Sequence, residues 1–182
     1  LSFGQLNYYI VNSINTVLFP TIVRDSTELS EYLRVLRMAM IPIVLATSGV
    51  VLGVNLLGTM VFGQEYTEIA IYVALLAPIF VLESYNRLFA TLLKAHNALY
   101  EFNRIAIYSL CLYFPLLFLF GYLFSIKGLI LASFFSYAFR SFLYVGWIRV
   151  SLSDNLSIYD FLPKSEEVAG VAKIIWEKYK DR

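Results

Sequence analysis

Apolar segments of membrane-spanning length constrain this chain more than any other feature, because they occupy most of its 182 residues. A transmembrane helix needs about 20 predominantly apolar residues to cross a hydrocarbon core of about 30 Å. The segments of this kind are residues 1–23, 38–64, 69–93, 105–126 and 128–148. Only 15% of the residues are charged, against about 25% in a typical soluble domain. The sequence therefore predicts an all-α fold, a polytopic membrane bundle of about five transmembrane helices.

Basic residues alternate between the connections of these predicted spans. Successive connections and the segment from residue 149 onward carry three, zero, two, one and six Lys or Arg residues. Because cytoplasmic segments are enriched in Lys and Arg, the connections 24–37 and 94–104 and the tail are predicted to be cytoplasmic. We expect a multi-pass protein of the cell (plasma) membrane whose C-terminus lies in the cytoplasm.

Two domains are predicted, a five-span membrane domain over residues 1–149 and a cytoplasmic tail over residues 150–182. Apolar residues follow the helical period in the tail, at Val168, Val171, Ala172, Ile175 and Tyr179. The connection 24–37 has the same period, at Leu29, Tyr32, Leu33, Leu36 and Met40. Both segments are therefore predicted to be amphipathic cytoplasmic helices that rest on the membrane or on the bundle. The chain begins inside an apolar segment without signal-peptide features, so we expect it to be the C-terminal part of a longer protein.

A carboxylate and a guanidinium lie four residues apart inside the third predicted span. Glu83 and Arg87 therefore share one face of a helix. Counted from Lys94 at the cytoplasmic edge, Arg87 lies about 10 Å deep and Glu83 about 16 Å deep. A charge near the bilayer centre costs about 2.5–3.5 kcal/mol on insertion scales. The two residues either form an ion pair that holds two helices in register or line a wet cavity.

A second polar stripe follows the fifth predicted span. Ser133, Tyr137, Arg140 and Tyr144 recur at spacings that place them on one helical face. Arg140 lies near the middle of this span, so its side chain should face protein or water rather than lipid. Its planar guanidinium suits a phosphate group, and Glu83 is the alternative partner.

The first predicted span is polar on one side, where Asn12 and Asn15 lie three residues apart. Such amides either join helices or line a cavity. The predicted candidates for a substrate pathway are Glu83, Arg87, Arg140, Asn12, Asn15 and Tyr137.

Catalytic and metal-binding motifs are absent from the sequence. It contains no nucleotide-binding loop, no nucleophile constellation and no zinc pattern, and its single cysteine, Cys111, lies in an apolar run. We therefore expect neither an enzyme nor a resident metal or cofactor. Membrane lipids are the predicted surroundings, and no nucleic acid is expected to bind.

Five short motifs follow one another along the predicted spans. They are LFPTIVR at Leu18–Arg24, IPIVL at Ile41–Leu45, VFGQEY at Val61–Tyr66, LLKAHNALYEFNR at Leu92–Arg104 and SIKGLILAS at Ser125–Ser133. In this order they resemble the multidrug/oligosaccharidyl-lipid/polysaccharide (MOP) flippase superfamily, especially its Wzx-like polysaccharide transporters. The resemblance covers about residues 3–149 and implies the later part of a second six-helix lobe, with an N-terminal lobe supplied by the same protein.

The resemblance implies a transporter that flips a lipid-linked oligosaccharide or polysaccharide precursor across the cytoplasmic membrane by alternating access. A drug–cation antiporter of the MATE-like kind has the same fold, with sodium or a proton as the coupling ion. Two arginines against one carboxylate inside the spans favour an anionic substrate over a cation. A third reading is a non-transporting membrane scaffold in which the charges only assemble helices.

Overall fold

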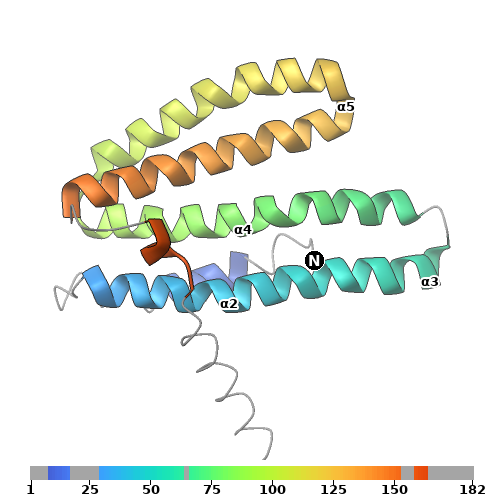
Figure 1. The fold of residues 1–182 in the computed structure, drawn as a ribbon, viewed down its shortest axis with the longest axis horizontal. Helices are drawn as coiled ribbons and strands as arrows, with labels where there is room; N and C mark the ends of the chain where they lie inside the picture. The colour runs from blue at the N-terminus through green and yellow to red at the C-terminus, as the bar shows by residue number, and fades with distance from the viewer. Residues whose placement is uncertain (1–7, 17–28, 64–65, 153–157, 164–182) are drawn as a thin grey trace, which may run out of the picture.

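The computed structural model describes residues 8–16, 29–63, 66–152 and 158–163, which are helical apart from short turns and contain no strand (Figure 1). Residues 8–16 form a short helix. Helix α2 (Leu29–Gly53) continues through the π-helical η1 (Val54–Gly58) into α3 (Thr59–Phe62). Helices α4 (Thr67–Ala95) and α5 (Leu99–Leu152) follow, and the 3-10 helix η3 (Ile158–Phe161) comes last. The described part of the chain is thus all-α, as predicted.

Three of these helices are long and apolar enough to cross a membrane, namely Tyr32–Gly58, Thr67–Ala95 and Leu99–Leu152. Large apolar side chains on them point outward, and Leu56 and Tyr122 are 68% and 90% exposed. An outer surface of this kind suits lipid rather than water. The helices therefore indicate a membrane-embedded protein. The first predicted span is described only at residues 8–16, so the number of five spans stays a prediction.

Helix α5 is a hairpin of two arms, which the structure places side by side (Figure 1). The helical geometry breaks at Ser125, which has a φ of 52° and a ψ of −130°. The predicted spans 105–126 and 128–148 fall on the two arms. Because the break needs a single residue, the arms reverse direction without a loop between them.

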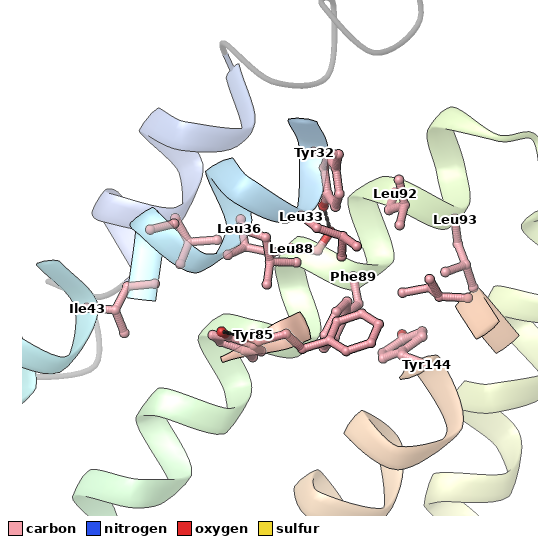
Figure 2. Packing of buried hydrophobic residues seen from close by; sticks show 14 of the residues in the cluster. Tyr32, Leu33, Leu36, Ile43, Tyr85, Leu88, Phe89, Leu92, Leu93 and Tyr144 are labelled. Atoms are coloured by element: carbon pink, nitrogen blue, oxygen red, sulfur yellow. Dashed lines mark hydrogen bonds between the residues drawn. The ribbon is translucent and has the colours of Figure 1, made fainter. Parts of the chain in front are cut away.

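One apolar cluster joins α2, α4 and the second arm of α5 (Figure 2). Tyr32, Leu33 and Leu36 on α2 are almost completely buried, and the Tyr32 hydroxyl donates a 2.7 Å hydrogen bond to the carbonyl oxygen of Leu88. The apolar face predicted for the connection 24–37 therefore packs on α4. The amphipathic segment and the second predicted span are therefore not separate helices. Helix α2 begins at Leu29 and runs from the connection into the predicted span without a break.

The short helix η3 packs between α2 and α4, where Figure 1 shows it in dark orange. Phe161 is 3% exposed, and its ring centroid lies 5.9 Å from that of Phe89. The Tyr85 hydroxyl donates to the carbonyl oxygen of Phe161, and Arg37 Nη1 donates to that of Asp160. The beginning of the tail is thus part of the core. The amphipathic helix predicted for residues 168–179 lies outside the described residues.

Removing the Phe161 ring should loosen this attachment. We expect Phe161→Ala to lower the free energy of unfolding by about 3–5 kcal/mol, because the ring fills a buried site between α2 and α4. Leu162→Ala is the matched control, since Leu162 is 48% exposed. Chemical denaturation of both variants in detergent measures the difference, and equal stabilities would contradict the buried role of Phe161.

Candidate functional site: a cationic cavity between α4 and α5

A cavity of about 350 Å³ lies between the helix of residues 8–16, α4 and α5. All of the predicted pathway residues line it, from three different helices: Asn12, Asn15, Glu83, Arg87, Tyr137 and Arg140. Its other lining residues are Asn86, Ala90, Thr91, Lys94, Phe102 and Tyr144. The polar faces that the sequence places on separate helices therefore meet at one hollow.

Glu83 and Arg87 form an ion pair within α4. Arg87 Nη2 lies 2.6 Å and Arg87 Nε 3.2 Å from Glu83 Oε1. The guanidinium carbon of Arg87 also lies 4.9 Å from the centroid of the Tyr8 ring, which fixes the helix of residues 8–16 against it. Because both charges belong to one helix, this pair does not hold two helices in register. It sits half exposed at the cavity wall instead.

Arg140 is held by neutral groups. Its Nε donates a 3.2 Å hydrogen bond to Ser109 Oγ on the other arm of α5, and its Cζ lies 5.8 Å from the Tyr137 ring. Ser109 is itself buried and lies 3.1 Å, Oγ to Oγ, from the buried Ser136. Within the part of the chain that the structure describes, Arg140 forms no ion pair, and Glu83 pairs with Arg87 instead. Arg140 thus presents an uncompensated positive charge to the cavity.

Asn86 links α4 to the second arm of α5 beside the cavity. Its Nδ2 donates to the carbonyl oxygen of Tyr137 at 3.0 Å, and its Oδ1 accepts from Ser141 Oγ at 2.9 Å. This exchange fixes the register in which Tyr137 and Arg140 face Arg87. Sequence reasoning missed Asn86, although a buried amide three residues after Glu83 is the kind of residue that joins membrane helices.

Asn15 leaves a hydrogen-bond acceptor unused. Its Oδ1 is inaccessible to solvent and accepts no hydrogen bond from the described residues. An unsatisfied buried acceptor costs about 1–3 kcal/mol. If the Asn15 side chain turned toward the cavity that it lines, a ligand hydroxyl could donate to this oxygen and recover that cost.

The cavity carries more positive than negative charge. Arg87, Arg140 and Lys94 oppose Glu83 alone, so three cations and one carboxylate give a formal charge of +2. Lys94 Nζ lies 4.7 Å from the centroid of the Phe102 ring, at the end of α4. Among the described residues no group of three His, Cys, Asp or Glu side chains could hold a metal ion. The arrangement is therefore suited to hold an anion rather than a metal or a cation.

Ser109 is expected to orient Arg140. We expect Ser109→Ala to weaken the binding of labelled pyrophosphate by roughly threefold to tenfold, because the lost hydrogen bond is worth about 1 kcal/mol. Ser133→Ala is the control, since its hydroxyl donates to Leu129 O within the same helix and lies outside the cavity. Equilibrium dialysis with the purified full-length protein compares the two, and unchanged binding by Ser109→Ala would argue against this orienting role.

The chain matches no protein-family model, no curated protein and no solved structure in the three comparisons made.

Proposed function

We propose that this chain is part of a membrane transporter that flips a lipid-linked oligosaccharide or polysaccharide precursor across the cytoplasmic membrane by alternating access. The observation that carries the proposal is the excess of positive charge in a cavity formed between apolar helices. A lipid-linked sugar precursor joins an anionic phosphate group to sugar hydroxyls and a long apolar chain. Its headgroup therefore needs a cationic, hydrogen-bonding hollow within a lipid-facing bundle.

Each part of such a headgroup has a counterpart among the lining residues. Arg87 and Arg140 would contact the phosphate oxygens, since guanidinium groups bind them in a fork-like geometry. Asn12 and Asn15 would bond sugar hydroxyls. Glu83 would either orient Arg87 or couple transport to sodium or a proton. The protein would make no covalent bond to its substrate.

The resemblance to the MOP superfamily supplies the wider architecture of this proposal. Five spans would form the later part of the second lobe, with the C-terminus in the cytoplasm of a plasma-membrane protein. An N-terminal lobe of the same protein would supply the opposite wall. The cavity is partly open, which leaves room for such a wall.

Two observations bear on the alternatives. A drug–cation antiporter needs a carboxylate available to a cation, whereas Glu83 is already paired with Arg87. A non-transporting scaffold gains support from Asn86 and Ser109, whose hydrogen bonds join separate helical segments. A scaffold alone, however, does not account for the uncompensated charge of Arg140.

The full-length protein in proteoliposomes separates these functions. We expect it to translocate a fluorescent lipid-linked oligosaccharide and not to export a cationic dye under a sodium or proton gradient. Dye export without lipid translocation would establish the antiporter in its place. If neither cargo moves, and a Glu83→Gln, Arg87→Gln double variant loses only thermal stability, the scaffold holds and the transporter is excluded.

A further inference from the structure

A second hollow, of about 460 Å³, lies between the two arms of α5. Its lining comes from α5 alone and shares no residue with the cationic cavity, and it includes Glu101, Arg104, Tyr108, Leu143, Gly146 and Trp147. We call it the α5 groove. Both of its walls are near the ends of the hairpin arms, where a membrane-spanning helix reaches the lipid headgroups.

The polar wall of the α5 groove holds two opposite charges with unused bonding capacity. Glu101 Oε2 lies 2.9 Å from Arg104 Nη2, yet it accepts no well-directed hydrogen bond and is inaccessible to solvent. The Arg104 side chain is about half exposed, and its Cζ lies 5.9 Å from the centroid of the Tyr108 ring. Arg104 can therefore swing away from the carboxylate without leaving a buried site. When Arg104 turns away, Glu101 Oε2 becomes available to a better-aligned donor.

The rest of the α5 groove is apolar and faces outward. Phe142 and Val150 are 68% and 81% exposed, and Trp147 lies between them in sequence. Trp, Tyr and Arg are the side chains that gather at the level of lipid headgroups, because each has an apolar body and a polar tip. The groove thus has a charged pair at one end and an apolar, outward-facing surface at the other. A phospholipid has the same order of parts, with a charged headgroup followed by apolar acyl chains.

We propose that the α5 groove binds one zwitterionic phospholipid with a primary ammonium headgroup, of the phosphatidylethanolamine class. The ammonium takes the place of Arg104 at Glu101 Oε2, and Arg104 turns to the phosphate. The acyl chain lies along Leu143 and Trp147. This inference is independent of the proposed transport function, since no residue is shared between the two sites.

The charges of the α5 groove select against other headgroups. Glu101 offsets Arg104, so the groove has no net positive charge to favour an anionic phosphatidylglycerol. A choline headgroup carries no N–H, so it cannot satisfy the carboxylate oxygen. Of these three headgroups, only the primary ammonium combines a positive charge with N–H donors that can take the place of Arg104 at Glu101.

Competitive lipid binding to the purified full-length protein tests the proposal by native mass spectrometry. Vesicle-derived mixtures of phosphatidylethanolamine, phosphatidylcholine and phosphatidylglycerol with identical acyl chains serve as the probes. We expect phosphatidylethanolamine to be retained about tenfold over phosphatidylcholine, an effect of about 1.4 kcal/mol. Equal retention of these two lipids, or a preference for phosphatidylglycerol, would overturn the assignment.

Variants show whether the α5 groove causes the preference for phosphatidylethanolamine. Glu101→Gln should abolish the preference, while Glu68→Gln, an exposed acid in the first turn of α4, should preserve it. Gly146→Leu places an apolar side chain where open space now lies and should displace the lipid without altering any charge. This variant decides the question if Glu101→Gln fails to fold. A preference that survives Gly146→Leu would place the lipid elsewhere and refute the proposal.

Discussion

Replacing Gly128 by valine is expected to prevent the two arms of α5 from closing against each other. A Cβ atom at this position would overlap the backbone carbonyl oxygen and carbonyl carbon of Phe120. These are backbone atoms of the opposite arm, so no side-chain rotation can relieve the overlap. The arms would have to separate, and the buried contact between Ser109 and Ser136 would be lost with their packing. The resulting loss should exceed the roughly 3–5 kcal/mol of a large core deletion.

The thermal unfolding of detergent-solubilised protein measures this effect. Gly49→Val is the matched control, because an added Cβ at Gly49 meets no atom within 4 Å. We expect the Gly128 variant to yield little folded protein and the Gly49 variant to unfold near the wild-type temperature. Wild-type stability of Gly128→Val would show that the arms do not pack as closely as the structure places them.

The sequence predicts which residues share a helix face and which faces avoid lipid. Both depend only on the spacing of residues within one helix and on the cost of placing a charge in lipid. Glu83 and Arg87 had to share a face, and Arg140 had to avoid lipid. Polar helix faces avoid lipid by turning toward one another. For this reason the charged faces of α4 and α5 meet Asn12 and Asn15 at one cavity. The helical period also indicated the face of α2 that packs on α4.

The partners within the cavity could not be predicted. Glu83 can reach Arg87 or Arg140 from its predicted face, and the choice depends on the distance between α4 and α5, which spacing along the chain does not fix. The i, i+4 pair is always within reach, and it is the one that forms. Ser109 gave no signal either, because a membrane serine can bond its own helix, as Ser133 does. Its link to Arg140 depends on how the hairpin closes.

The position of η3 could not be predicted from the sequence either. Residues 158–161 follow the last apolar segment, so they read as the beginning of a cytoplasmic tail. Their attachment depends on backbone carbonyl groups, which carry no residue-specific signal, meeting Arg37 and Tyr85. Arg37 is one of the three basic residues that predict a cytoplasmic connection over residues 24–37. Its burial adds a structural role to that count.

Neutralising both cavity arginines should abolish transport. We expect an Arg87→Ala, Arg140→Ala double variant to lose roughly 100-fold or more of its lipid-linked oligosaccharide translocation. Each charge-assisted hydrogen bond to phosphate is worth about 1.5–3 kcal/mol, so two together account for a loss of that size. The formal charge of the cavity would fall from +2 to 0, because Lys94 and Glu83 alone would remain charged. The site would then keep its amides and lose its attraction for an anion.

The matched control removes the same charge elsewhere. Arg34 and Arg149 are exposed and do not line the cavity, so an Arg34→Ala, Arg149→Ala variant should transport as the wild type does. Arg140→Lys tests geometry separately. It keeps the charge but lacks the planar fork, and it should retain only part of the activity. Full translocation by the Arg87→Ala, Arg140→Ala protein, inserted at wild-type levels, would show that the uncompensated charge at Arg140 serves helix assembly and not an anionic cargo.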